Sequence, residues 1–220
     1  MKNTILVILS VGLFVLGSCR DGKRYHSENA RVVQLVQEDP IDEILNFQKE
    51  MNESFRDPEV SPLNDNQRKD FDGLDFFDPD TTYRVVARLV RTPEALPFLM
   101  PTTTERKSRE RVYGIAHFSF GSEVFELEVY QNIELLDEPG YEDYLFLPFT
   151  DATNGKTTYS GGRYIDLSIP DGDSLLIDFN RSYNPYCVYN EEYSCPIVPA
   201  VNHLEIEVLA GIKDYNKKEP

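Results

Sequence analysis

Carboxylate, amide and phenol side chains gather where a predicted strand ends and a long irregular connection, residues 180–202, begins. Asp178 closes the strand, and Asn180, Tyr183 and Asn184 follow it. Together these groups suit the orientation of a polar ligand, or acid–base chemistry in a hydrolase-type site centred on Asp178. The alternative is that Asp and Asn satisfy the backbone of an irregular turn. Both interpretations stay open at this level.

A second polar connection, residues 150–163, is rich in Gly and Thr. Tyr159 and Arg163 have the chemistry to hold an anion there, unless Arg163 pairs inside the fold with Asp178 or Asp151. Two adjacent glycines permit close backbone approach but form no phosphate loop, because the Walker lysine and the strand-to-helix context are missing. The candidate ligand-binding residues of the two connections are Asp151, Thr153, Tyr159, Arg163, Asp178, Asn180, Tyr183, Asn184 and Asn202.

Other familiar chemistries have little support in the sequence. The three histidines, His26, His117 and His203, show no metal-ligand spacing, so no metal site and no cofactor are expected. Residues 171–173 read as a turn because the other ligands of a calcium loop are missing. No serine lies in a nucleophile elbow. The basic run at residues 106–111 is interpreted as a solvated loop that enters a strand.

The N-terminus has the pattern of an export signal. Lys2 precedes an apolar run, residues 5–16, that is too short to span a bilayer, and Leu-Gly-Ser-Cys follows at residues 16–19. This ending looks like a lipobox, which predicts cleavage of residues 1–18 and lipidation of Cys19; the alternative is an ordinary signal peptide with an incidental cysteine. No acidic residue directly follows the cysteine, which favours the outer membrane of the cell envelope.

Two further cysteines, Cys187 and Cys195, remain once Cys19 carries the lipid. An exported chain meets an oxidising compartment, so the sequence predicts a disulfide between them. The alternatives are half of a zinc site or a nucleophilic Cys187.

The chain is strongly acidic, with 38 acidic against 22 basic residues and a formal charge of -16. Nucleic acid is therefore not an expected partner, because phosphate binding needs a basic surface. The lipid, not charge, is expected to hold the chain at the membrane, and protein partners are left open. The predicted organisation is a signal peptide at 1–18, a lipidated tether at 19–38, one β-rich domain at 39–213 and a polar tail at 214–220.

The elements that position the polar connections are mainly strands. Asp39 and Pro40 predict the start of a helix that runs to about residue 55. From Thr82 the apolar period changes to two, and Gly121 with Ser122 predicts a type II′ hairpin. Strands are expected near residues 83–89, 112–120, 123–130, 144–149, 164–169, 174–179 and 203–209. The fold class is thus mainly β (α+β): an antiparallel β-sandwich or partly open barrel of about seven strands with one N-terminal helix packed on it.

Several short motifs resemble one family. They include Pro-Phe-Thr-Asp-Ala-Thr-Asn-Gly at residues 148–155, Gly-Gly-Arg-Tyr at 161–164, Asp-Phe-Asn at 178–180 and Tyr-Asn-Pro at 183–185, with Cys187, Cys195 and Asn202 beyond them. In order and spacing they are similar to the domain of unknown function family 1684, over roughly residues 40–212. The resemblance implies a shared domain and brings no activity with it.

The sequence thus predicts an envelope-anchored lipoprotein that binds a small or extended polar ligand at the 150–163 and 178–202 loops. A hydrolase-type enzyme and a structural or assembly lipoprotein are the alternatives. Arg163 and Asp178 are expected to lie close together. A cavity between the loops favours binding or catalysis, a carboxylate of raised pKa in it favours catalysis, and a filled interior favours a structural role.

Overall fold

The computed structural model describes residues 39–215. The predicted signal peptide, Cys19, the tether and most of the polar tail lie outside the described residues. Within residues 39–215, no helix has the length and apolarity to cross a membrane.

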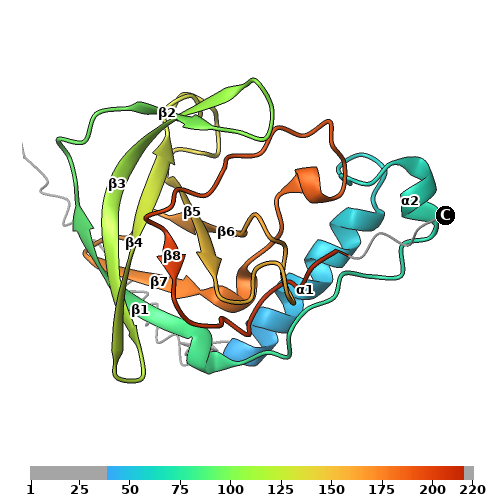
Figure 1. The fold of residues 1–220 in the computed structure, drawn as a ribbon, viewed down its shortest axis with the longest axis horizontal. Coiled ribbons are helices and arrows are strands. Elements are labelled where there is room, and N and C mark those ends of the chain that lie inside the picture. Colours follow the sequence, from blue (N-terminus) through green and yellow to red (C-terminus); the bar gives the residue numbers. More distant parts are fainter. Residues whose placement is uncertain (1–38, 216–220) are drawn as a thin grey trace, which may run out of the picture. The chain divides into compact units, whose positions relative to one another are not determined.

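Two α-helices precede the sheet. Helix α1 (Pro40–Arg56) begins as predicted: the Asp39 side chain accepts from the Ile41 backbone N–H, and proline occupies the first turn. Its buried face carries Ile44 and Phe55. Helix α2 (Asp65–Lys69) is short and starts with a capping box. Helix α1 contacts η2 (Phe179–Arg181), a 3₁₀ turn that directly follows β7 (Ser174–Asp178) (Figure 1).

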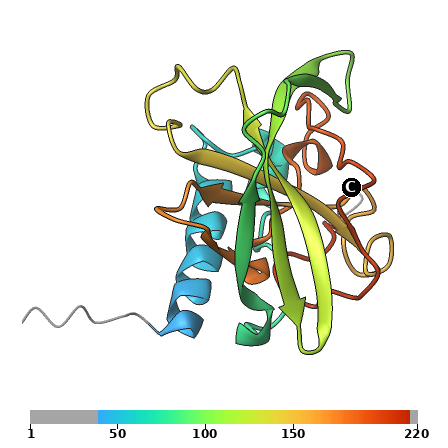
Figure 2. The same cartoon turned by 90° about the vertical axis from the view of Figure 1, so that its left-hand side faces the viewer.

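One eight-stranded sheet forms the body of the domain, in the order β6-β5-β4-β3-β1-β7, with β2 paired to β3 and β8 paired to β5. Every pairing is antiparallel except that of β5 with β8. The sheet curls, and its end strands β6 and β7 contact each other without pairing, so it is a half-barrel (Figures 1 and 2). The fold class predicted from the sequence, in its partly open barrel form, is confirmed. The remaining strands are β1 (Arg84–Arg91), β2 (Phe98–Pro101), β3 (Lys107–Phe120), β4 (Glu123–Asn132), β5 (Tyr144–Asp151), β6 (Arg163–Ser168) and β8 (His203–Leu204), with 3₁₀ turns η1 (Thr81–Tyr83) and η3 (Tyr186–Val188).

The long β3–β4 hairpin turns as its sequence predicts (Figure 2). Gly121 has a φ of 59°, whereas no non-glycine residue of the described chain has a positive φ. A positive φ at the first loop residue alone is the signature of a type II′ turn, because type I′ requires it at both.

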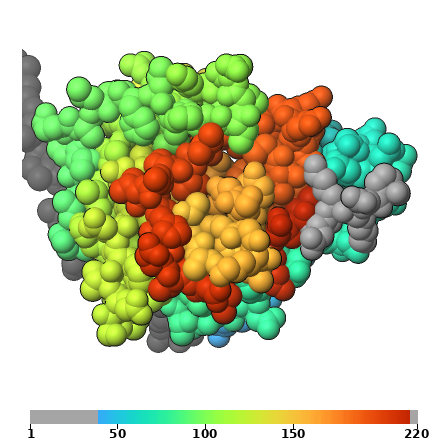
Figure 3. Space-filling model, in the orientation of Figure 1, coloured from blue at the N-terminus to red at the C-terminus, as the bar shows by residue number. Residues whose placement is uncertain are grey.

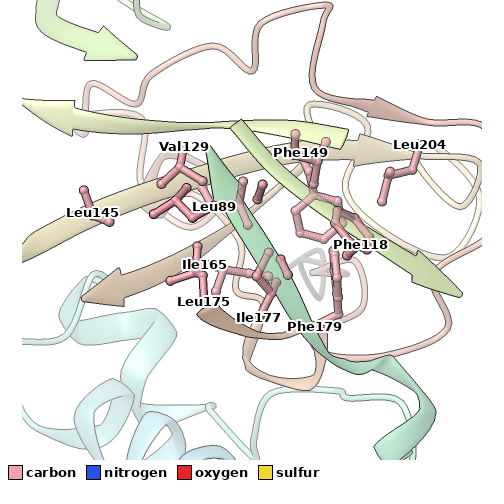
Figure 4. Packing of buried hydrophobic residues seen from close by; sticks show 14 of the residues in the cluster. Leu89, Phe118, Val129, Leu145, Phe149, Ile165, Leu175, Ile177, Phe179 and Leu204 are labelled. Atoms are coloured by element: carbon pink, nitrogen blue, oxygen red, sulfur yellow. The ribbon is translucent and has the colours of Figure 1, made fainter. Parts of the chain in front are cut away.

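The main core lies inside the curl. Alternate residues of the strands and the C-terminal segment point into it, including Phe118, Leu145, Phe149, Ile177 and Phe179 (Figure 4). Because successive strand side chains point to opposite faces, the neighbours of these residues on β5 and β6 face the other way. Phe146 and Tyr164 on that outer face form a second cluster with Met100 and Tyr130.

Candidate functional site

Arg163 and Asp151, two of the predicted site residues, form a structural ion pair. Their side chains are 2.8 Å apart and neither is exposed. The guanidinium also donates to the backbone carbonyls of Val208, Ala210 and Ile212. Burial lowers the pKa of Arg163, and the Asp151 carboxylate opposes that shift. Of its two predicted partners, Asp178 and Asp151, Arg163 thus pairs with Asp151.

Asp178 and Asn180 also serve the fold. The Asp178 carboxylate accepts from the backbone and side-chain amides of Asn180 and lies 3.8 Å from Arg84. Asn180 in turn bonds both the N–H and the C=O of Asp80. These contacts agree with the interpretation in which Asp178 and Asn180 satisfy the backbone of an irregular turn.

Two other predicted residues, Asn202 and Asn184, join segments that are distant in sequence, whereas Thr153 bonds within its own loop. The Asn202 side chain is fully buried and bonds the backbone N–H and C=O of Glu128 and the carbonyl of Pro148. Thr153 donates to Asp151, and Asn184 donates to the Lys213 carbonyl. The 150–163 loop lies at the surface, flanked by the C-terminal segment (Figure 3).

The predicted disulfide is absent. Cys187 and Cys195 are free thiols, although they lie close enough for the Cys187 backbone N–H to donate to the Cys195 sulfur at 3.1 Å. The hydrogen bond from Cys195 lowers the pKa of the Cys187 thiol to about 7. The loop is held instead by hydrogen bonds, among them the one from the Cys195 N–H to the Thr103 hydroxyl.

A cavity of about 580 Å³ opens on the outer face of the sheet. Its walls come from α1, the start of β3, the end of β4, strands β5 and β6, and the 183–196 part of the long connection. Of the predicted ligand-binding residues, Tyr183 lines it. Its aromatic lining consists of Phe47, Tyr144, Phe146, Tyr164, Tyr183, Tyr186 and Tyr193, and its charged lining of Arg106, Glu110, Glu134 and Asp166.

Glu110 is the most constrained polar group of the wall. It is 2% exposed, and its Oε1 accepts from the Ser108 hydroxyl at 2.6 Å and the Asn132 amide at 2.6 Å. Its Oε2 is buried without a hydrogen-bond partner in residues 39–215. Burial raises the pKa of this carboxyl, although the two hydrogen bonds act in the opposite direction. A buried acceptor without a donor is uncommon in folded proteins.

A second carboxyl, Asp166, faces the cavity between two phenols. Its Oδ1 accepts from the Tyr144 hydroxyl at 2.8 Å and the Tyr183 hydroxyl at 2.6 Å. Solvent still reaches the carboxyl through the cavity, but the surrounding walls raise its pKa by desolvation. Burial raises the pKa of Tyr144 most, and the charges of Asp166 and Glu110 raise it further, so the two carboxyls act on one phenol.

A pattern of alternating burial on β3 indicates this site. On β3, Ser108 and Glu110 are buried while Lys107 and Arg109 are exposed. Polar residues at the buried positions of an alternating strand indicate that this end of the strand borders a polar site. The signal is hard to recognise in the sequence, because the basic residues at 106–111 are typical of a solvated loop.

No group of three or more metal-ligating side chains occurs within residues 39–215. The described cavity is lined by carboxyl, hydroxyl and amide groups together with aromatic rings, which offer hydrogen bonding, charge stabilisation and proton transfer.

Comparisons with known proteins agree with the motifs. The model of the DUF1684 family, proteins of unknown function, matches residues 69–213, and the chain belongs to this family. The solution structure of an uncharacterized protein of Haloarcula marismortui is similar at 33% identity and a TM-score of 0.61, covering 78% of this chain and 92% of that one. The comparison with curated proteins gave no match.

Proposed function

We propose that this domain binds a small polar ligand in the outer-face cavity. The observation that carries the proposal is the Glu110 Oε2, buried without a donor in the wall of a cavity of about 580 Å³. Leaving such an acceptor unsatisfied costs about 1–3 kcal/mol, which a donor on a ligand recovers. A cavity of this size, lined by rings and a few convergent polar groups, is typical of small-molecule sites.

Only one of the two loops that the sequence indicated as ligand-binding, residues 178–202, contributes to the proposed site. The 178–202 connection supplies Tyr183 and several other wall residues, whereas no residue of the 150–163 loop lines this cavity. Asp151 and Arg163 instead fix the C-terminal segment.

A second candidate is a hydrolase-type enzyme. The raised pKa values of Glu110 and Asp166 favour it, because an upward shift lets a carboxyl hold its proton to higher pH and so suits a general acid. In a hydrolase-type site, Glu110 and Asp166 would be the acid–base groups. The sequence analysis assigned that role to Asp178, which instead caps η2.

The test is a binding screen against the full chain in detergent. A fragment set with amines, carboxylic acids, phosphates and neutral sugars is scored by NMR shifts of isotope-labelled tyrosine. Ligand binding in the cavity shifts Tyr144 and Tyr183, which line it, and leaves Tyr113 unchanged, which packs in the main core. A screen without any shift at the cavity tyrosines refutes the proposal and favours the structural or assembly role.

The export part of the proposal concerns residues outside 39–215. We infer an envelope lipoprotein held in the outer membrane through acyl chains on Cys19, because several chains on one cysteine give stable anchoring. Cys19→Ala is expected to leave unprocessed precursor and to abolish acyl labelling. Detergent partitioning of the variant like that of the wild type contradicts the inference.

A further inference from the structure

We propose that the ligand of the cavity is an organic amine, whose protonated nitrogen is received by Glu110 and Asp166 among the tyrosine rings. This inference rests on the proposed function, since it names the class of ligand that the same cavity takes.

The charge of the lining is the first argument. Three carboxyls, Glu110, Glu134 and Asp166, face the cavity against one guanidinium, Arg106. That guanidinium is already engaged, because it donates to the Ser194 hydroxyl at 3.1 Å and the Ser194 carbonyl at 2.8 Å. When its carboxyls are ionised, the open cavity therefore has an excess of negative charge, and its low-dielectric walls strengthen the attraction for a cation.

The hydrogen-bonding capacity of the carboxyls is the second argument. Each has one oxygen occupied by protein donors, Glu110 by Ser108 and Asn132, and Asp166 by two phenols. Their second oxygens have no hydrogen-bond partner in the described chain, and that of Glu110 is fully buried. An ammonium group carries three donors and no acceptor, so its hydrogen-bonding capacity matches carboxyl oxygens of this kind. A carboxylate or phosphate ligand would meet like charges there.

The rings are the third argument. Phe146 and Tyr164 pack edge to face with centroids 4.8 Å apart, and Tyr183 continues the row at 5.9 Å from Tyr164. Tyr186 packs against a further ring of the wall, Tyr193. Aromatic faces attract cations through their quadrupole, most strongly where water is excluded. A neutral sugar also stacks on such rings and can donate hydroxyl hydrogen bonds to the carboxyls, but it gains no attraction of opposite charges from them.

Matched pairs of probes separate charge from shape. The full chain in detergent is titrated with 2-phenylethylamine and 2-phenylethanol, and with cyclohexylmethanamine and cyclohexylmethanol, by ligand-observed NMR. Within each pair the amine is expected to bind at least about 10-fold more tightly, equivalent to about 1.4 kcal/mol. Glu110→Gln keeps a carbonyl oxygen for Ser108 and Asn132 and is expected to remove most of this preference, because the amines lose much more affinity than the alcohols.

The matched control is Glu126→Gln on β4, which removes the same charge from a side chain that is 68% exposed. It is expected to leave the affinities for amine and alcohol unchanged. A second readout is pH: amine affinity should rise as Glu110 and Asp166 ionise, while the amine itself stays protonated. The other ionisable groups that face this site are Arg106, Glu134, Tyr144, Tyr164, Tyr183, Tyr186, Tyr193 and Cys195.

Two results overturn the inference in distinguishable ways. Equal binding of amine and alcohol, unchanged in Glu110→Gln, refutes the amine class but leaves ligand binding in the cavity intact. Failure of all four probes refutes it as well, and the fragment screen then decides whether the cavity binds another class. A structural role for Glu110 alone predicts equal losses for amine and alcohol, which also contradicts the inference.

Discussion

Arg163 and Asp151 form an ion pair whose atoms approach to 2.8 Å with neither side chain exposed to solvent. Because three backbone carbonyls of the C-terminal segment accept from the same guanidinium, the pair holds that segment against the sheet. It is therefore a point on which folding depends.

Arg163→Met is expected to lower the free energy of unfolding by about 3–5 kcal/mol, because it leaves the Asp151 carboxylate buried without its partner. Urea unfolding measures the loss. The control is Lys156→Met, which breaks an exposed pair with Glu207 and should cost less than about 1 kcal/mol. Equal losses in the two variants would contradict the structural role.

Asn202→Ala is expected to lower the free energy of unfolding by about 2–4 kcal/mol, since it removes the side chain that bonds both backbone groups of Glu128 and the carbonyl of Pro148. Guanidinium unfolding checks it against Asn66→Ala, an exposed control in α2 that should change stability by about 0.5 kcal/mol or less. If Asn202 contacted ligand instead, its variant would lose affinity and keep stability.

Glu110 should give the domain a specific pH dependence. Its pKa is raised above 4.5 in the folded state, so the folded protein binds the proton more tightly than the unfolded one. The stability that Glu110 contributes is complete below pH 4.5 and is lost as pH rises through the folded pKa. Wild-type stability should therefore fall relative to Glu110→Gln over that window, as thermal melts in a buffer series record.

The control for the pH series is Glu123→Gln, which removes one negative charge from the exposed end of the β3–β4 hairpin. If the stability of the wild type relative to Glu110→Gln does not change between pH 4 and 8, the shift assigned to Glu110 is wrong. If the wild type instead became more stable than Glu110→Gln as the pH rises, the pKa of Glu110 would be lowered in the folded state and not raised.

Cys187 should react as a thiolate near neutral pH. Its pKa is lowered to about 7 by the hydrogen bond from Cys195, so alkylation by iodoacetamide should rise through about pH 7 and level off above it. Cys195→Ala removes that bond and should move the rise to higher pH. Peptide mapping follows the modification, and a denatured, unreduced chain without free thiols at these positions would contradict the free pair.

Local signals explain the parts of the fold that the sequence predicted correctly. Asp39 and Pro40 determine the start of α1, and Gly121 determines the turn of the β3–β4 hairpin, through contacts within a few residues. Strand β2 was not predicted, because Phe98–Pro101 is short, lies between prolines and pairs only with β3.

The segment near residue 205 shows how an alternating burial pattern can be correct although the strand predicted at residues 203–209 is much shorter. Leu204 and Val208 are buried and Glu205 and Glu207 exposed, as in a strand, yet β8 ends at Leu204. The carbonyl of Val208 binds the Arg163 guanidinium instead of a neighbouring strand. Alternation reports burial, and it does not reveal what satisfies the backbone.

The site was located only in part for a similar reason. Tyr183 was a candidate and lines the cavity, but Glu110 and Asp166 lie within strands, where a single carboxyl reads as an outward position. Two of the predicted residues, Asp178 at the end of β7 and Asn202 in a loop, have buried backbone partners. Loop polarity alone does not separate a residue that builds a turn from one that meets a ligand.

Helix α1 lines one side of the cavity with residues that precede the range matched by the family model. Glu110 and Asp166 lie within residues 69–213, which the family model matches, whereas Phe47, Met51 and Ser54 of α1 lie before them. The helix thus supplies an aromatic, an apolar and a hydroxyl side chain to a wall whose carboxyls come from the strands and the β4–β5 connection. Substitutions along one face of α1 can retune the width and polarity of the opening while the two carboxyls, and the chemistry they offer, remain as they are.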